Sequence, residues 1–244
     1  MLTKFRELSK LFLIQKFILG QALQSVRGNR RSSHLLTELY LDALGEKSRL
    51  PRRSLGDFIP GIEDSIISIY GKSHPYLTEG FADREALTSA NETCALAAIT
   101  RAVRPKKILE IGTAKGGSTY QFFLNSDAII FTLDLGTPEI ANEAIRKCFQ
   151  SERIRVLTSD SRTFDFSALE NVDMIFIDGG HDAETVLSDS ENAFKIISKG
   201  GVVLWHDYKP SFPGVFSALN NLSRERKIQH IWGTSLAAYR HPDF

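Results

Sequence analysis

The chain has 244 residues, of which 42% are hydrophobic and 24% charged, so it can bury a sizeable core and is not a disordered protein. Its 30 basic and 29 acidic residues nearly balance, which excludes a general attraction to nucleic acid. The two cysteines, Cys94 and Cys148, have no CxxC or cysteine/histidine metal spacing and indicate reduced, buried thiols in a cytoplasmic protein.

The N-terminal stretch, residues 1–31, has apolar residues at helical spacing and predicts an amphipathic helix. Gln15 and Lys16 interrupt its apolar runs, so it is too broken to span a bilayer. Basic residues dominate its polar side, with Glu7 as the acidic exception. We expect residues 1–26 to pack on the core or mediate self-association, and peripheral binding to an anionic membrane is the alternative.

A change of composition predicts where the main domain begins. Between Gly28 and Pro60, connector-like segments surround one short helical stretch. We therefore expect residues 1–75 to form a helical N-terminal extension and residues 76–244 to form the main domain.

Strands and helices alternate from Arg84 onward. A helix over 84–104 is expected to end at Pro105, and a final pair of strands is expected to turn at Gly233. Near-continuous apolar runs are typical of strands that are covered on both faces, so we predict a parallel, doubly wound, Rossmann-like α/β fold. The other strands are expected at 107–112, 128–135, 154–160, 173–180 and 200–207.

Polar residues end these strands, where doubly wound sheets bind their ligands. They are Glu110, Asp134, Asp160, Asp178 and the pair His206-Asp207.

The sequence KKILEIGTAKGGST, residues 106–119, forms a glycine-rich step from a strand to a helix. Gly112, Ala114 and Gly117 match the dinucleotide-binding pattern, which leaves an NAD(P)-dependent oxidoreductase as one candidate. Glu110 would repel a pyrophosphate but would suit a cationic ligand such as S-adenosylmethionine, unless it is only a cap or surface carboxylate. Asp134, 22 residues after Gly112, is placed to accept ribose hydroxyls. Asp160-Ser161 could accept from the adenine amino group.

Two stretches carry a resemblance to a known family. ILEIGTAKGGST resembles the first motif of class I S-adenosylmethionine-dependent methyltransferases. FIDGGHDAETVLSDSENAFKIISKGGVVLWHDY resembles the branch that includes macrocin-type sugar O-methyltransferases and cephalosporin-hydroxylase-like proteins. The resemblance covers residues 77–239 and implies a mostly parallel, seven-stranded sheet. The branch pattern falls on Asp178, Gly179, His181, Asp189, Gly200-Gly201 and His206-Asp207.

The resemblance also implies a site. Asp178 and Asp207 are expected to hold Mg²⁺ or another divalent cation, with His206 as a third ligand that suits such a hard cation poorly. Gly180 stands where related enzymes have an aspartate base, so His181 is the candidate base beside Asp178, unless it only caps the helix that starts near Asp182 and ends at Gly200. The expected cofactor residues are Glu110, Gly112, Thr113, Ala114, Gly116, Gly117, Ser118, Thr119, Asp134, Leu135, Asp160 and Ser161.

The function that follows is transfer of a methyl group from S-adenosylmethionine to a hydroxyl of a small molecule, with sugars or glycosides as one class, assisted by a divalent metal. An NAD(P)-dependent oxidoreductase and a non-catalytic protein that keeps the fold are the alternatives.

Overall fold

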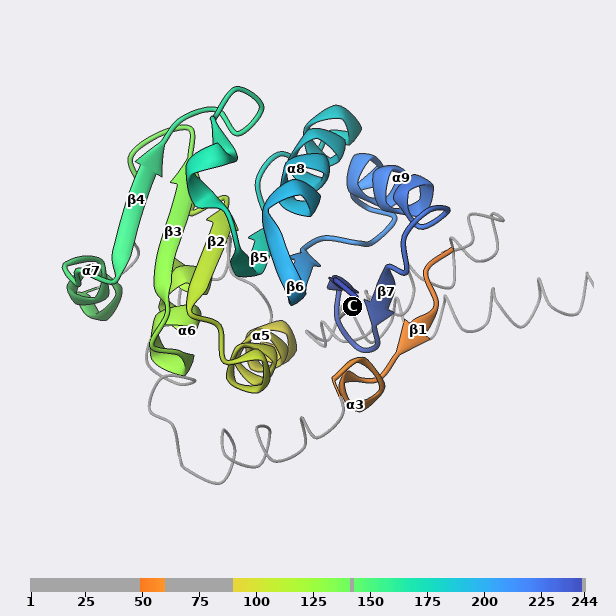
Figure 1. The fold of residues 1–244 in the computed structure, drawn as a ribbon, viewed down its shortest axis with the longest axis horizontal. Helices are drawn as coiled ribbons and strands as arrows, with labels where there is room; N and C mark the ends of the chain where they lie inside the picture. Colours follow the sequence, from red (N-terminus) through yellow and green to blue (C-terminus); the bar gives the residue numbers. More distant parts are fainter. Residues whose placement is uncertain (1–48, 60–89, 141–142, 243–244) are drawn as a thin grey trace, which may run out of the picture. The chain divides into compact units, whose positions relative to one another are not determined.

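The computed structural model describes residues 49–59, 90–140 and 143–242, and shows the expected alternation of strands and helices around one sheet (Figure 1). These elements belong to one compact unit, Arg49–Tyr208 with Phe212–Phe244. The strands are β1 (Arg52–Arg53), β2 (Lys107–Ile111), β3 (Ile129–Asp134), β4 (Ile154–Thr158), β5 (Val172–Ile177), β6 (Ile197–Trp205), β7 (Gln229–Ile231) and β8 (Ala237–Arg240). The helices are α3 (Leu55–Phe58), α5 (Ala90–Val103), α6 (Gly117–Asn125), α7 (Glu143–Phe149), η2 (Phe166–Leu169), α8 (Ala183–Ile196) and α9 (Pro213–Leu222).

The order of strands in the sheet is β1-β7-β8-β6-β5-β2-β3-β4. All neighbours pair in parallel except β8, which is antiparallel to both β6 and β7. The chain leaves β2 to build β3 and β4 on one side, and returns to build β5 and β6 on the other. The order therefore reverses at β2 and β5, the switch point at which doubly wound folds bind ligands. The predicted fold class is confirmed.

The sheet has one strand more than the seven expected. The additional strand is β1, whose Arg52 and Arg53 pair with His230 and Ile231 of β7. Two exposed arginines make no apolar run, so the hydrophobic pattern could not indicate a strand there. Residues 49–59 thus contribute to the sheet, while the proposed boundary near residue 75 lies outside the described residues and stays a prediction.

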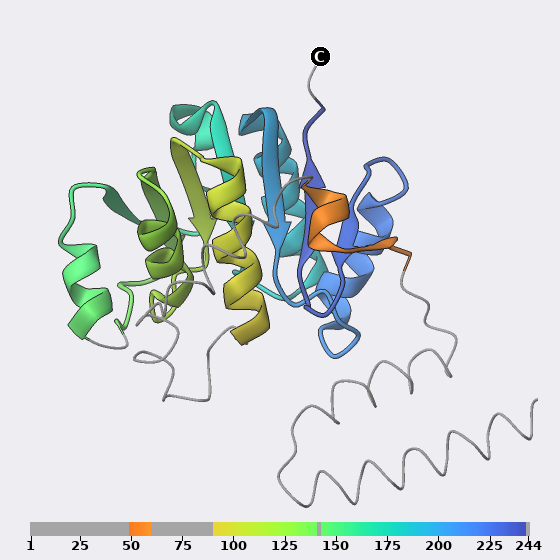
Figure 2. The ribbon, with the colours of Figure 1, turned by 90° about the horizontal axis from the view of Figure 1, so that it is seen from below.

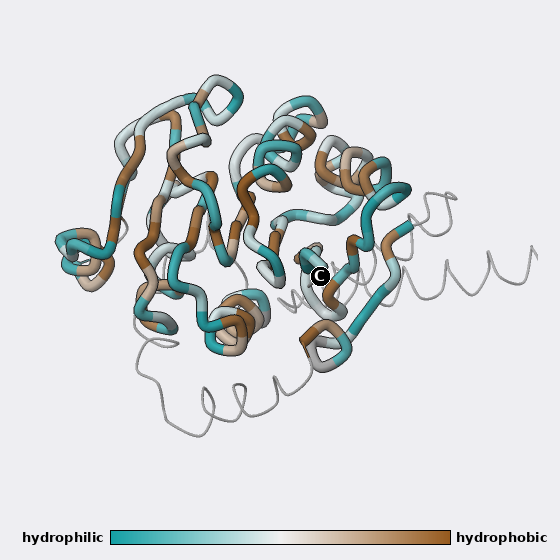
Figure 3. Tube along the Cα trace, viewed as in Figure 1, coloured by the Kyte–Doolittle hydropathy of each residue, from teal (hydrophilic) through white to brown (hydrophobic). Residues whose placement is uncertain are grey.

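Helices cover both faces of the sheet (Figure 2). α5, α6 and α7 pack on one face, where Leu96, Phe122 and Cys148 are buried. α8, α9 and η2 pack on the other, where Val186 and Leu219 are buried. The central strands are hydrophobic along most of their length (Figure 3), as expected for strands with a core on each side. This burial fixes the strand ends that carry the polar side chains.

The ends of two helices test the local predictions. α5 ends at Val103, two residues before Pro105, as expected. α8 begins after Asp182, whose side chain accepts a hydrogen bond from the Thr185 amide, so the predicted cap is confirmed. The prediction that Gly200 ends α8 was wrong, because the helix stops at Ile196 and Gly200 lies inside β6 with a φ of +73°. The β-branched pair Ile196 and Ile197 favours the early change to strand.

No helix in the described part of the chain is long and apolar enough to cross a membrane. The predicted amphipathic helix of residues 1–31 lies outside that part, so packing, self-association and membrane binding of residues 1–26 stay predictions.

Candidate active site

The glycine-rich turn joins β2 to α6. Gly112 has a φ of +99°, and a Cβ built on it would lie 2.1 Å from the main-chain oxygen of Asp178. Only glycine tolerates both this conformation and this approach. Gly116, with a φ of +79°, precedes α6 and donates its amide hydrogen to the Thr113 carbonyl over 2.8 Å. The turn is therefore held close to the end of β5.

Asp134, at the end of β3, supports this turn from the side. Its Oδ2 accepts hydrogen bonds from the amides of Thr113, at 2.8 Å, and Ala114, at 2.9 Å. Its Oδ1 accepts from the amide of Leu135 at 2.7 Å. The carboxylate thus orders the turn and still lies at the cavity, because each carboxylate oxygen can accept more than one hydrogen bond.

Glu110 is fully buried beneath the turn and lies outside the cavity wall. It accepts a short hydrogen bond from the Thr119 hydroxyl and another, of 2.6 Å, from the Thr132 hydroxyl. Burial raises the pKa of Glu110 to about 8, although both hydrogen bonds act in the opposite direction. The charge argument from the sequence placed this carboxylate beside the ligand. The structure places it in the core between β2, β3 and α6.

A cavity of about 510 Å³ opens at the carboxyl ends of β2 to β5. The expected site residues on its wall are Gly112, Ala114, Asp134, Leu135, Asp160, Ser161, Asp178 and His181. Those outside its wall are Glu110, Thr113, Gly116, Gly117, Ser118, Thr119, His206 and Asp207. The strand ends were thus correctly expected to meet at one edge of the sheet, while part of the turn and of α6 lies behind the wall.

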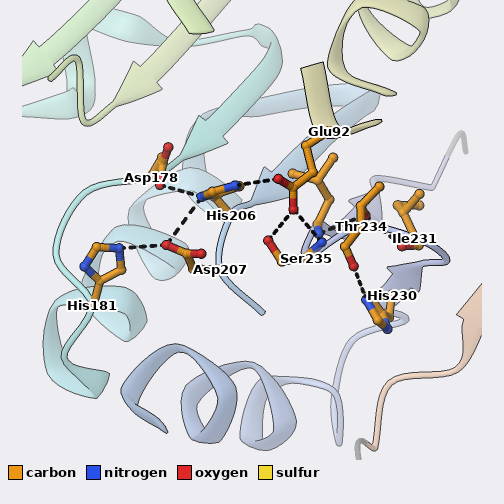
Figure 4. A network of polar contacts seen from close by, with 10 residues as sticks. Glu92, Asp178, His181, His206, Asp207, His230, Ile231, Thr234 and Ser235 are labelled. Atoms are coloured by element: carbon orange, nitrogen blue, oxygen red, sulfur yellow. Dashed lines mark hydrogen bonds and ion pairs between the residues drawn. The ribbon is translucent and has the colours of Figure 1, made fainter. Parts of the chain in front are cut away.

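His206, after β6, lies among three carboxylates (Figure 4). Its Nδ1 is 3.1 Å from Asp178 Oδ1 and 3.4 Å from Asp207 Oδ2, and its Nε2 is 3.5 Å from Glu92 Oε2. Burial alone would lower the pKa of His206, but contacts with Asp178, Asp207 and Glu92 outweigh it and raise the pKa to about 12. His206 is therefore an imidazolium that compensates these acids.

His181 points to the same cluster from the start of α8 (Figure 4). Its Nε2 lies 3.1 Å from Asp207 Oδ2, and its ring packs against that of Phe212 with centroids 4.6 Å apart. The side chain is 48% exposed and lies on the cavity wall. Because Asp182 makes the helix cap, the alternative role of His181 as the cap is not needed.

Asp207 contacts both His181 and His206, and its backbone has an unusual conformation. Its φ of +57° lies in the left-handed region, which aspartate tolerates better than most residues. Within the described part of the chain, Asp178, His181 and Asp207 each offer a ligand atom within 4.8 Å of the others, a set that could hold a metal ion. The sequence suggested Asp178, His206 and Asp207 as ligands. In the structure both His181 and His206 face these aspartates, and the choice of metal ligands stays a prediction.

Glu92 is the residue that the sequence analysis missed. It lies on α5 and accepts hydrogen bonds from the Ser235 amide, at 2.7 Å, and hydroxyl, at 2.5 Å, while its other oxygen faces His206. The one available signal was a glutamate in an otherwise apolar helix segment. Arg162 on the cavity wall was missed as well, because it belongs to no motif.

Comparison with known proteins agrees with this architecture. The profile of a family described as a methyltransferase domain matches residues 109–208. A search of curated proteins found no match.

Solved structures with the same fold were found at low sequence identity. A methyltransferase from Podospora anserina, solved with S-adenosylhomocysteine, aligns with a TM-score of 0.56 at 19% identity, over 75% of this chain and 97% of the other. An O-methyltransferase from Bacillus cereus with the same ligand gives 0.54 at 17%, over 75% and 98%. CalS11, a TDP-rhamnose 3'-O-methyltransferase, gives 0.51 at 15%, over 62% and 78%. Residues 109–208 thus match the profile of a methyltransferase domain, and the described core around them shares its fold with these solved methyltransferase structures.

Proposed function

We propose that this chain transfers the methyl group of S-adenosylmethionine to a hydroxyl group of a small molecule, with sugars and glycosides as the first class to test. The observation that carries the proposal is His181 on the wall of the cavity that the glycine turn and Asp134 border, 3.1 Å from Asp207, which lies outside that wall. A binding turn and a candidate base thus meet at one cavity. Structures of the same fold include O-methyltransferases, one of them named for a sugar nucleotide.

The reaction requires one bond to form and one to break. The substrate oxygen attacks the methyl carbon, the carbon–sulfur bond breaks, and S-adenosylhomocysteine remains. The hydroxyl proton must leave as the new bond forms. We assign His181 as the base: its Nε2 lies 3.1 Å from Asp207, and in the tautomer whose Nε2–H donates to that carboxylate, Nδ1 is able to accept the proton. Asp207 fixes the ring and stabilises the imidazolium that results.

A divalent cation would be held by Asp178 and Asp207, while His181, the third member of this cluster, keeps its role as the base. Two carboxylates suit magnesium or manganese, because both accept oxygen ligands. When bound, the metal would lower the pKa of the substrate hydroxyl and hold a neighbouring oxygen. The imidazolium of His206 already compensates part of the negative charge, so the metal is a second element of the proposal and needs its own test.

The decisive experiment is methyl transfer from labelled S-adenosylmethionine to a panel of sugars, nucleotide sugars and catechols. We expect transfer to at least one class, and a loss of activity in EDTA that manganese restores. Full activity in EDTA would remove the metal and keep the methyltransferase. No stabilisation of the protein by S-adenosylhomocysteine, with stabilisation by NAD instead, would overturn the methyltransferase proposal in favour of an oxidoreductase.

Two further elements of the proposal concern the cell. A cytoplasmic location fits the free thiols of Cys94 and Cys148. Residues 1–26 are proposed to mediate self-association or membrane contact, which light scattering and liposome sedimentation of the intact chain would separate.

A further inference from the structure

The charges on the cavity wall are unevenly distributed. Among its described residues, four carry a carboxylate and one a guanidinium: Asp134, Asp160, Asp178, Asp182 and Arg162. The carboxylates at the glycine-turn end already have partners, because Asp134 accepts main-chain amides and Asp178 faces His206. At the opposite end, Arg162 is the residue that meets the acids.

Arg162 holds Asp160 in one orientation. Its Nε lies 3.0 Å from Asp160 Oδ1, its terminal nitrogen lies 2.6 Å from Oδ2, and its amide donates to Oδ1 over 2.9 Å. These contacts hold the pKa of Asp160 down, at about 2, so the pair stays ionised. The two side chains are 54% and 29% exposed, and such exposed pairs contribute little to folding. We therefore expect the Arg162–Asp160 pair to act on the ligand in the cavity and not on folding.

Arg162 also interacts electrostatically with acids that lie farther away than Asp160. Asp182 and Glu184, at the start of α8, both raise the pKa of Arg162. Asp189, farther along α8, is fully buried, and neither of its oxygens makes a hydrogen bond of normal geometry. Burial raises its pKa to about 6, while Ser161 and Arg162 act in the opposite direction. Removal of the guanidinium would leave these carboxylates to repel one another.

We infer that Arg162 positions the cofactor by fixing and neutralising Asp160 at the adenine end of the cavity. This inference rests on the proposed function. S-adenosylmethionine is neutral at its adenine and cationic at its sulfonium and amino groups. The paired Asp160 accepts from the adenine amino group through its remaining lone pairs, whereas an Asp160 without Arg162 would not be held in the orientation that this hydrogen bond needs.

The test is a double-mutant cycle, read by calorimetric titration with S-adenosylhomocysteine and with adenosine. Arg162→Met should weaken both ligands by about tenfold, because both contain the adenine. Asp160→Asn should weaken them less, and Arg162→Met with Asp160→Asn should match Asp160→Asn alone, since no charge remains to compensate. Arg146→Met is the matched control, because Arg146 makes a similar exposed pair with Glu143 at 2.7 Å on α7 and lies off the cavity wall.

Each outcome separates the hypotheses. Unchanged affinity in Arg162→Met, or strictly additive effects in the double variant, would overturn the role of Arg162 while the proposed function stands. A loss for S-adenosylhomocysteine but not for adenosine would also overturn it, since Arg162 would then act on the amino-acid end. If Arg162→Met does not fold, Arg162→Lys keeps the charge without the fork and should show a smaller loss, and wild-type affinity there would contradict the inference. A wild-type protein that binds neither ligand overturns the proposed function itself.

Discussion

The two ends of the candidate active site are held together by different kinds of contact. At the glycine turn, the contacts are with the main chain. Asp134 accepts hydrogen bonds from three main-chain amides, and Gly112 allows the backbone to approach Asp178 closely. At the histidine cluster, side chains from α5, from the loop before α8 and from the ends of β5 and β6 form ion pairs and hydrogen bonds with one another. The first arrangement is a rigid binding scaffold. The second is a set of titratable groups whose charges depend on each other, as proton transfer requires.

This difference explains what the sequence could predict. Gly112, Asp134, Asp160 and Asp178 were correctly expected to meet at one edge of the sheet, because each lies within one motif, at a spacing that the fold imposes. Glu92, Ser235 and Arg162 were not found, because their roles depend on contacts such as that between Glu92 and Ser235, 143 residues apart. Glu110 was assigned by charge alone. Burial decided its position, and hydrophobic periodicity does not reveal on which side of the sheet a strand-end carboxylate will lie.

The largest effect is expected from Gly112→Ala, which changes the glycine-rich turn between β2 and α6. The new Cβ would meet the Asp178 main chain at 2.1 Å in a backbone conformation that alanine avoids. We expect cofactor binding to be lost and the free energy of unfolding to fall by about 2 kcal/mol or more. Gly136→Ala is the control, because no atom lies within 4 Å of the position that its new Cβ would take, and it should stay near wild type. Urea unfolding and calorimetry measure both, and a normal Gly112→Ala protein would refute the packing account of the turn.

The next effect concerns the titratable end. His181→Ala and Asp207→Asn should each lower turnover by about a hundredfold or more, because the base or its orienting partner is lost. Asparagine is chosen because it tolerates the left-handed backbone at position 207. Affinity for S-adenosylhomocysteine should remain unchanged in both variants. Normal turnover in His181→Ala would show that another group takes the proton.

A third prediction concerns the pH dependence of the free energy of unfolding, to which Glu110 beneath the glycine turn contributes. The pKa of Glu110 is raised to about 8 by burial, so the folded state keeps a proton that the unfolded state loses above about 4.5. Stability should therefore fall as the pH rises from about 4.5 to 8, by about 2 kcal/mol between pH 5 and pH 7 from this group. Glu110→Gln should remove that decline in urea unfolding. An identical pH profile in the variant would mean that Glu110 is ionised in the fold.

The smallest effect is expected from Glu92→Gln. His206 has a raised pKa, so its charge stabilises the fold fully below about 6.5, and that stability is lost as the pH rises toward about 12. Glu92→Gln removes one of its acids and should lower the free energy of unfolding by about 1 kcal/mol at pH 7. The gap from wild type should close as the pH rises. A gap that does not change with pH would show that Glu92 acts on packing alone.

The most direct test of the whole account is calorimetric titration of the intact chain with S-adenosylhomocysteine. We expect one binding site per chain, which Gly112→Ala abolishes and His181→Ala leaves intact. Absence of binding in the wild-type protein, or binding that survives Gly112→Ala, would contradict it.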